Sequence, residues 1–473
     1  MKRIFNFLAC IAIMFMAMPA TMLAKEKAPE VKYVFYMIGD GMGINEVVGT
    51  ELYNKGTGLG PEEINFLNFP VRGFVTTHSA SALVTDSAAG GTALASGVKT
   101  YNNAIGVDAD KNPVSVLGEW VAASGKGVGV ITSVGVNHAT PASFYAHAED
   151  RNDYENIILQ YIASDVDFAA GGGILTKRGS GNDAAYFEQK AEDAGIKVYH
   201  GKNEWSKMSK SDKRVLCLSG KTEGELPYAI NRKADDTTLS DFVSAGISYL
   251  ESKFAKKGFF MMVEGGRIDN AGHADDGATC FQEVNDFAAA IDVVLAFYEK
   301  HPDETLIVVT ADHETGGLML GAGRYEMKPE LLKAQKMSTD MLSRLFGETF
   351  KKENNPTWEE AKAFFTEHLG LWGDVAVDRR TEQELKAIFD RNYGKTDSTE
   401  ERVVNMYSSS SLMVQQAVGY LNKAAGYGWS YGSHSGSPVG LYVKGKAAEA
   451  FLPARDNTDI APIIAKVAGY SNK

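Results

Sequence analysis

Four short apolar runs of this chain each lead directly into a polar turn that contains glycine. They span residues 31–38, 127–131, 259–263 and 305–310. Each run is almost continuously apolar, which is the pattern of strands buried on both faces of a parallel sheet. Helical patterns accompany them, with one candidate at 113–124 and another from about 278 to 300. This alternation predicts an α/β fold whose central, mostly parallel sheet is flanked by helices on both faces.

The composition changes after Ala322, where a long charged stretch begins. Within it, Thr357 and Thr381 are each followed three residues later by glutamate, the capping-box pattern that starts helices. We therefore expect an inserted α-rich subdomain at about 323–428. A strand-like run at 439–443 would return the chain to the main sheet.

The N-terminus has the pattern of a secretory signal peptide. Lys2 and Arg3 precede an apolar run at 4–18, and cleavage after Ala24 or Ala20 would release the mature chain. We favour a signal peptide at 1–24, and a lipoprotein anchored through Cys10 is the weaker alternative because the apolar run continues past it. No second run approaches the ~20 residues that span a bilayer. These features predict a periplasmic or secreted protein without a stable membrane span.

The chain is acidic, with 48 Lys and Arg against 60 Asp and Glu and a formal net charge of −12. This balance argues against nucleic-acid binding, which needs clustered cations. Taken alone, it also disfavours an anionic substrate. After signal cleavage only Cys217 and Cys280 remain, and the sequence leaves one disulfide and two buried thiols equally open.

Carboxylates and imidazoles follow the predicted strands. Ligands of open α/β sheets bind outside the carboxyl ends of the strands, so these side chains should converge. Asp269 and His273 are four residues apart, a spacing that places both on one face of a helical turn. The full set of three carboxylates and three imidazoles is sufficient for two zinc ions and comprises Asp40, Asp269, His273, Asp312, His313 and His434.

Ser87 is the candidate nucleophile. It begins a helical, Ala- and Gly-rich stretch after Asp86, and the free N–H groups of a helix N-terminus bind phosphate. The alternative is that Ser87 is an ordinary N-cap. Since no Gly-x-Ser-x-Gly elbow surrounds it, activation would have to come from a metal ion.

Taken in order, the segments around Asp40, Ser87, 264–273, 310–313 and His434 resemble the secreted bacterial alkaline phosphatases. The resemblance covers most of the chain. It implies an alkaline-phosphatase-like catalytic domain at 25–473 that forms a homodimer and hydrolyses small phosphate monoesters, with two Zn²⁺ and one Mg²⁺ per subunit. The inserted segment would be a crown-like lid or dimer element.

The resemblance also implies a role for each site residue. Ser87 would become phosphorylated, Arg151 would hold the phosphate, and Asp86 would also belong to the substrate site. One zinc would bind Asp269, His273 and His434, and the other would bind Asp40, Asp312 and His313. Magnesium would bind Asp40, Thr140 and Glu264. Bound cations would make the site positive despite the acidic chain.

Two residues depart from some relatives, and both are expected beside the ligands. His138 stands next to the expected magnesium site, and Asn270 follows Asp269. A phosphodiesterase or sulfatase of the same superfamily is the nearest alternative, but Ala89 and Gly91 occupy the positions where a sulfatase needs Pro and Arg. A non-catalytic phosphate-binding protein is the alternative outside the enzymes.

Overall fold

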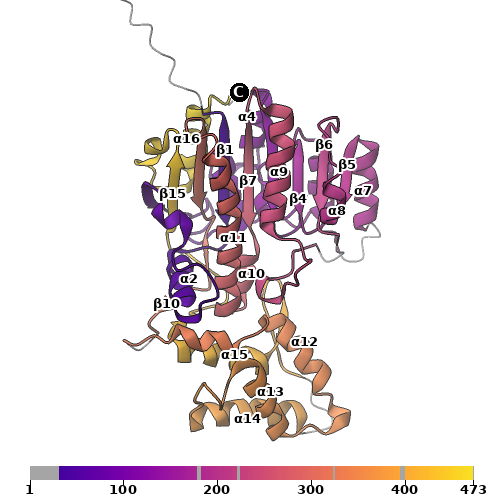
Figure 1. The fold of residues 1–473 in the computed structure, drawn as a ribbon. Coiled ribbons are helices and arrows are strands. Elements are labelled where there is room, and N and C mark those ends of the chain that lie inside the picture. The colour runs from indigo at the N-terminus through magenta and orange to yellow at the C-terminus, as the bar shows by residue number, and fades with distance from the viewer. Residues whose placement is uncertain (1–30, 178–182, 221–223, 323–324, 395–399, 472–473) are drawn as a thin grey trace, which may run out of the picture. The chain divides into compact units, whose positions relative to one another are not determined.

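A nine-stranded sheet in the order β2-β15-β8-β1-β7-β3-β4-β6-β5 forms the framework of the computed structural model (Figure 1). The structure describes residues 31–177, 183–220, 224–322, 325–394 and 400–471, so the predicted signal peptide and Cys10 lie outside the described residues. The strands of the sheet are β1 Tyr33–Gly39, β2 Val71–Val75, β3 Gly127–Thr132, β4 Phe168–Gly171, β5 Ile196–His200, β6 Arg214–Leu218, β7 Phe259–Gly265, β8 Thr305–Thr310 and β15 Val439–Gly445.

All four predicted strand runs are confirmed, as β1, β3, β7 and β8. β1 lies at the centre and pairs in parallel with β7 and β8, so that Ile38 is level with both Glu264 and Thr310. The carboxyl ends of these three strands therefore meet at one edge. The predicted last strand is confirmed as β15, which runs antiparallel to both β2 and β8.

Helices cover both faces of the sheet. α9 and α11 pack over one face of the sheet, in front of it in Figure 1. α9 contacts β3, β4 and β7, and α11 contacts β1 and β7. On the opposite side, α4 and α5 contact β3 and β7, and α16 contacts β1. α3 packs against these three helices. These helices are α3 Ser87–Ser96, α4 Leu117–Ala123, α5 Ala139–Ala142, α9 Leu239–Phe254, α11 Gly277–Tyr298 and α16 Ile460–Ala468.

The two helices predicted from the sequence are present with different precision. α11 spans Gly277–Tyr298, close to the predicted range of about 278 to 300, and Asp276 is its N-cap. The helix predicted at 113–124 begins only at Leu117. Pro113 forms an antiparallel bridge with Val107, which keeps the chain extended just before the helix. Further helices are α2 Ile44–Thr57, α6 Tyr154–Ala163, α7 Ala184–Asp193, α8 Gly201–Trp205 and α10 Arg267–His273.

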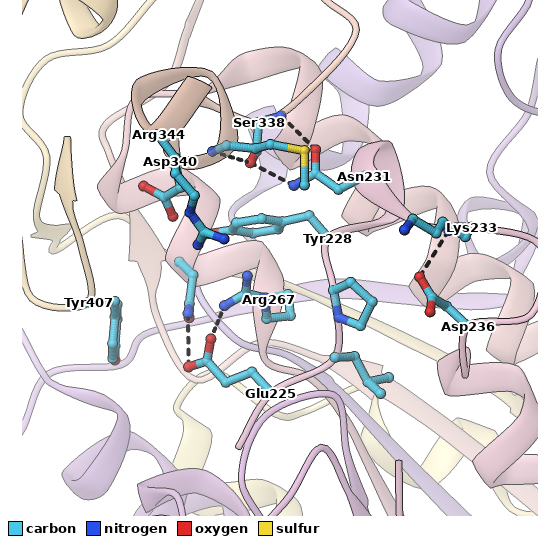
Figure 2. Close-up of a pocket in the computed structure, with 14 residues that line it drawn as sticks. Glu225, Tyr228, Asn231, Lys233, Asp236, Arg267, Ser338, Asp340, Arg344 and Tyr407 are labelled. Carbon is cyan, nitrogen blue, oxygen red and sulfur yellow. Dashed lines mark hydrogen bonds and ion pairs between the residues drawn. The ribbon is translucent and has the colours of Figure 1, made fainter. Parts of the chain in front are cut away.

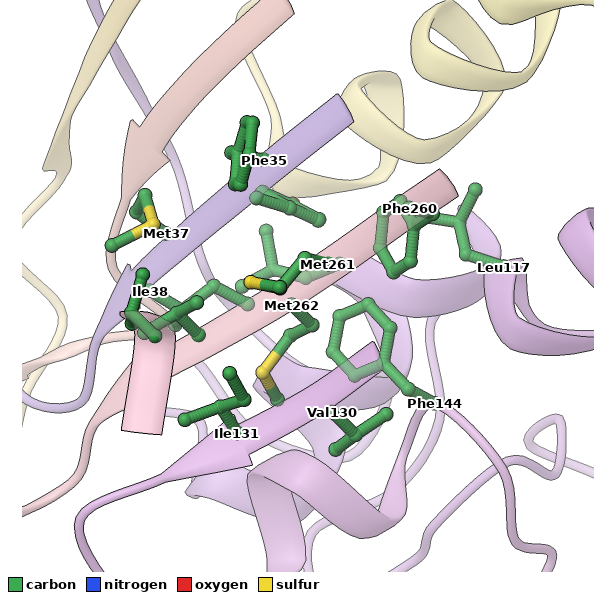
Figure 3. Packing of buried hydrophobic residues seen from close by; sticks show 14 of the residues in the cluster. Phe35, Met37, Ile38, Leu117, Val130, Ile131, Phe144, Phe260, Met261 and Met262 are labelled. Carbon is green, nitrogen blue, oxygen red and sulfur yellow. The ribbon is translucent and has the colours of Figure 1, made fainter. Parts of the chain in front are cut away.

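Side chains of β1, β7 and β3 fill the main hydrophobic core. Phe35, Phe260 and Met262 are fully buried, and Phe144 stacks on Phe260 with ring centroids 6.0 Å apart (Figure 3). Truncating a buried phenylalanine of this kind typically costs about 3–5 kcal/mol. The tight packing holds the strand ends, and the side chains that follow them, in fixed positions.

The described part of the expected α-rich insertion contains four α-helices and a short hairpin. Its elements are α12 Thr339–Thr349, α13 Trp358–Leu369, α14 Arg379–Tyr393, β11 Arg402–Val404, β12 Ser409–Ser411 and α15 Leu412–Ala425. Thr357 caps α13 with Glu360, as predicted. The prediction for Thr381 was wrong: α14 begins earlier because Asp378 is its N-cap and accepts from the N–H of Thr381.

The insertion has a second hydrophobic core that is shared with the sheet-flanking helices. Phe346, Phe365 and Leu421 of the insertion belong to the same buried cluster as Tyr53 of α2 and Phe281 of α11. Residues 31–473 accordingly form one compact unit by their contacts.

The cysteines and the membrane prediction can be compared with the structure directly. Cys217 and Cys280 are buried free thiols, so the structure favours the second of the two cysteine alternatives. Among the described residues, no helix is both long and apolar enough to cross a bilayer.

Candidate active site

The candidate site lies where the three central strands end. Asp40 follows β1, Glu264 is the penultimate residue of β7, and Asp312 follows β8 after one intervening residue. Gly41 allows Asp40 to approach α10 closely, because its φ is +69° and a Cβ there would lie 2.9 Å from the Cα of Asp269. The predicted convergence of these carboxylates is confirmed.

The first ligand cluster contains Asp269, His273 and His434, with candidate ligand atoms all within 4.8 Å of one another. Nδ1 of His273 donates to the carbonyl of Gly432 at 3.0 Å, and Nδ1 of His434 donates to the carbonyl of Thr85 at 2.9 Å. In the neutral form of each ring, the lone pair of Nε2 would therefore point inward. The two Nε2 atoms are 3.1 Å apart. Two lone pairs at this distance repel unless a cation lies between them, so the arrangement fits a metal ion.

The second cluster contains Asp40, Asp312 and His313, all fully buried. Nε2 of His313 lies 3.4 Å from Asp40 Oδ1 and 3.5 Å from Asp312 Oδ2. Both oxygens of Asp40 lack a hydrogen-bond partner among the described residues. A buried carboxylate without a donor is costly, and a bound cation would satisfy it. Imidazole with carboxylates is the donor set that zinc accepts.

The third cluster contains Asp40, His138 and Glu264, and it shares Asp40 with the second cluster. Oε2 of Glu264 accepts from the hydroxyl of Thr132, whereas its Oε1 has no hydrogen-bond partner among the described residues. Thr140 lies near these carboxylates, and its hydroxyl donates to Asp312 Oδ2 at 3.4 Å. Carboxylate and hydroxyl oxygens are the ligands that magnesium prefers.

His138 is a member of this third cluster, but its contact with Arg151 uses the lone pair of the neutral ring. Nη2 of Arg151 lies 3.1 Å from Nε2 of His138, and a guanidinium can only donate, so Nε2 is the acceptor. The proton of the neutral ring is then on Nδ1, which faces Glu264 Oε1 at 4.0 Å. In this tautomer His138 accepts from Arg151 and has no lone pair left for a metal, and its Nδ1 has no hydrogen-bond partner among the described residues.

The electrostatics of the site reflect the concentration of negative charge. Burial raises the pKa of Asp40 well above its usual range, and the neighbouring Asp312 and Asp269 raise it further. Burial also raises the pKa of Glu264, to about 7. For Asp269, burial acts in the same direction but is outweighed by the nearby rings of His273, His434 and His313, which lower its pKa below the usual range. Divalent cations would keep such a group of carboxylates ionised.

Ser87 is the first residue of α3, not its N-cap. Asp86 is the N-cap and accepts from the N–H of Ala89, so the hydroxyl of Ser87 is not used for capping. Instead Ser87 Oγ lies 3.2 Å from Nε2 of His313, beside the second cluster. Gly90 allows this approach because a Cβ at that position would lie 2.9 Å from the carbonyl oxygen of Asp312.

Arg151 reaches the helix that carries Ser87. Its Nη1 donates to Asp86 Oδ2 at 3.1 Å, and the pair is almost completely buried. Glu149 and Asp150 directly precede Arg151 in the chain, but the ion pair that Arg151 forms inside the site is with Asp86. A guanidinium has five N–H donors in one plane, so Arg151 can hold Asp86 and still donate to a phosphate.

Tyr407 is a site residue that no sequence pattern indicated. This residue lies in the insertion, between β11 and β12, yet its hydroxyl is 3.4 Å from Nη2 of Arg151 and its ring centroid is 5.3 Å from that of His273. No local pattern marks it, because its role depends on how the insertion folds against α10. Asn270, the residue after Asp269, has its amide beside Arg267 and Glu225.

Comparison with known proteins agrees with this geometry. Residues 31–470 match the alkaline phosphatase family model. The chain belongs to the alkaline phosphatase family. It is 32% identical over 464 residues to alkaline phosphatase 3 of Bacillus subtilis, covering 95% of this chain and 91% of that protein. It is 27% identical to the repressible alkaline phosphatase of Saccharomyces cerevisiae, over 93% of this chain and 81% of that protein.

Solved structures of the family share the fold. The cold-active alkaline phosphatase of the psychrophile Shewanella sp. has a TM-score of 0.75 at 31% identity, covering 92% of this chain and 99% of that chain. A variant of the alkaline phosphatase from the Antarctic bacterium TAB5 has a TM-score of 0.65 at 26% identity, covers 94% of this chain and 100% of that chain, and is described with Mg bound in its M3 site.

Proposed function

We propose that the chain hydrolyses phosphate monoesters to an alcohol and inorganic phosphate through a phosphoserine formed on Ser87. The observation that carries the proposal is the position of the Ser87 hydroxyl, 3.2 Å from His313 in one ligand cluster and next to Asp86, which holds Arg151. Nδ1 of His313 faces a threonine hydroxyl at 3.2 Å rather than a carboxylate, so a serine-protease type of triad is not supported.

Metal binding follows from the three clusters. In the proposal, Asp269, His273 and His434 hold one zinc, and Asp40, Asp312 and His313 hold the other. Asp40, Thr140 and Glu264 hold magnesium, in keeping with the Mg described in the M3 site of the TAB5 variant. When bound, these cations would lower the pKa of the Ser87 hydroxyl and neutralise charge on the phosphate oxygens.

The chain's own residues position the reaction. The N–H groups at the start of α3 and the guanidinium of Arg151 bind the phosphate oxygens, which aligns phosphorus with Ser87 Oγ. The Ser87 oxygen forms a bond to phosphorus as the bond to the alcohol oxygen breaks, and the alcohol leaves with a proton. Water then attacks the phosphoserine, which releases phosphate and restores the Ser87 hydroxyl.

Two further proposals rest on family membership and on the N-terminal sequence. We propose a homodimer, as the resemblance implies, and export through the signal peptide formed by Lys2, Arg3 and the apolar run at 4–18. Size-exclusion chromatography with light scattering tests the first. N-terminal sequencing of protein recovered from the periplasm or the medium tests the second.

The catalytic proposal is tested with purified protein and an aryl phosphate at alkaline pH. We expect phosphate release that is lost with a chelator and restored by zinc with magnesium. Acid quenching should trap one phosphate on the peptide that contains Ser87, and Ser87→Ala should abolish both the label and most of the activity. A preference for a diester or a sulfate ester, or full activity of Ser87→Ala, would contradict the proposal.

A further inference from the structure

A cavity of about 510 Å³ lies beside the candidate active site (Figure 2). Its volume falls within the roughly 300–1,000 Å³ typical of small-molecule sites. Three parts of the chain line it: the segment before α9, helix α10, and the insertion. Its lining residues are Glu225, Leu226, Pro227, Tyr228, Asn231, Lys233, Asp236, Arg267, Asn270, Ser338, Asp340, Met341, Arg344 and Tyr407.

The cavity adjoins the site without including its ligand clusters. Tyr407 forms one wall of the cavity in Figure 2, and the same side chain contacts Arg151 and packs against the ring of His273. Asn270 lines the cavity and directly follows the ligand candidate Asp269 on α10. A phosphate held by Arg151 would therefore lie close to Tyr407 at the edge of the cavity, and the alcohol part of its ester could extend into the cavity.

Most polar groups of the cavity are already paired within the protein. Arg267 forms an ion pair with Glu225 and stacks over the ring of Tyr228, 3.6 Å from its centroid. Asn231 donates to Ser338 Oγ at 2.7 Å and accepts from the Ser338 N–H at 2.9 Å. These groups shape the cavity but have little capacity left for a ligand.

The two remaining carboxylates of the cavity also have hydrogen-bond partners. Asp340 Oδ1 accepts from the hydroxyl of Ser410 at 3.0 Å, and Asp236 Oδ2 accepts from the backbone N–H of Lys233 at 2.9 Å. By contrast, the ammonium of Lys233 and the guanidinium of Arg344 have no hydrogen bond or ion pair within the described ranges of the chain. The cavity is lined by equal numbers of acidic and basic side chains, but the charged groups that are still free to bind a ligand are the two cations, Lys233 and Arg344.

Building on the proposed function, we propose that this cavity binds the alcohol part of the substrate. Lys233 and Arg344 then select monoesters whose alcohol part carries a second anionic group, either a carboxylate or a phosphate. Both cations are exposed at the cavity and can reach an anion without breaking an existing contact. An ammonium and a guanidinium each form charge-assisted hydrogen bonds with such a group.

The test uses two substrates of equal chain length that differ in one group. In 6-phosphogluconate the carbon farthest from the phosphate is a carboxylate, and in sorbitol 6-phosphate it is a neutral alcohol. Phenyl phosphate serves as a third substrate that lacks a second polar group. For the unmodified enzyme we expect kcat/KM to be higher for 6-phosphogluconate than for sorbitol 6-phosphate, with the preference decreasing as salt is added.

The variants Lys233→Ala and Arg344→Ala should each lower kcat/KM for 6-phosphogluconate about 3- to 10-fold, as expected for one exposed charge-assisted contact, and leave the other two substrates within twofold. Lys207→Ala and Arg380→Ala, at surface positions outside the cavity, are the matched controls. Equal values for the two sugar esters, or equal losses on all three substrates, would overturn the inference. Failure of the unmodified enzyme to hydrolyse any of the three would instead refute the proposed function.

Discussion

Nη2 of Arg151 and the hydroxyl of Tyr407 lie 3.4 Å apart, although the two residues are 256 positions apart in the chain. Arg151 comes from the sheet domain, and Tyr407 comes from the insertion. The insertion thus helps to fix the group that is expected to hold the phosphate. Tyr407 acts through Arg151 and is a positioning residue in this proposal.

Tyr407→Phe should weaken phosphate binding with little effect on the later steps. The ring would stay against His273, but Arg151 would lose one acceptor. A single net hydrogen bond is worth about 0.5–1.5 kcal/mol, which corresponds to a rise of about 2- to 10-fold in KM and in the inhibition constant of inorganic phosphate. Steady-state kinetics would measure both, with the exposed Tyr431→Phe as control. A fall in kcat at constant KM would contradict a positioning role.

Arg151→Lys should not preserve activity even though it preserves charge. Lysine cannot present two parallel donors to a phosphate while also keeping the bond to Asp86. Losing a hydrogen bond to a charged group costs about 1.5–3 kcal/mol, or roughly 10- to 100-fold in kcat/KM. The measurement is kcat/KM for an aryl phosphate together with phosphate inhibition, and Arg380→Lys on the surface of α14 is the control. A variant with normal phosphate affinity would contradict the proposed role of Arg151 in holding the phosphate.

Asp276→Ala should destabilise the junction between α11 and the insertion. Asp276 is buried and accepts hydrogen bonds from Thr279, Gln335 and Thr339. Its removal leaves several buried donors unpaired, each costing about 1–3 kcal/mol, so we expect a loss of at least about 3 kcal/mol in the free energy of unfolding. Urea denaturation would measure this, with the exposed Asp374→Ala as control. Unchanged stability would show that the junction does not depend on Asp276.

His147 should make stability depend on pH. A hydrogen bond to Glu119, 3.0 Å from Nε2, raises the pKa of His147. Because the folded state holds the proton more tightly, the stabilisation is complete below about pH 6.5, the unfolded value, and is lost as pH rises through the raised pKa. The stability difference between the unmodified protein and His147→Gln should therefore be larger at pH 5.5 than at pH 9. Chemical denaturation at both values measures it, and an equal difference would exclude the linkage.

The sequence carried much of the fold because strand burial leaves a local signal. The runs that became β1, β3, β7 and β8 are continuously apolar, and α11 has both an N-cap and an apolar face. Helix boundaries were less accurate wherever a distant or neighbouring contact decided them. Pro113 is held extended by Val107, and Asp378 displaces Thr381 as the N-cap of α14.

The candidate ligands could be named from the sequence because each follows a strand and is of a residue type that core packing does not require. The sequence by itself therefore determined five of the nine strands of the sheet, β1, β3, β7, β8 and β15, and the types of side chain that follow the central ones. Only the tertiary structure decided how they act: which nitrogen of His138 carries the proton, that Asp86 rather than Ser87 caps α3, and that Tyr407 reaches Arg151. These properties depend on hydrogen bonds between residues far apart in the chain, and such contacts leave no periodic pattern in the sequence.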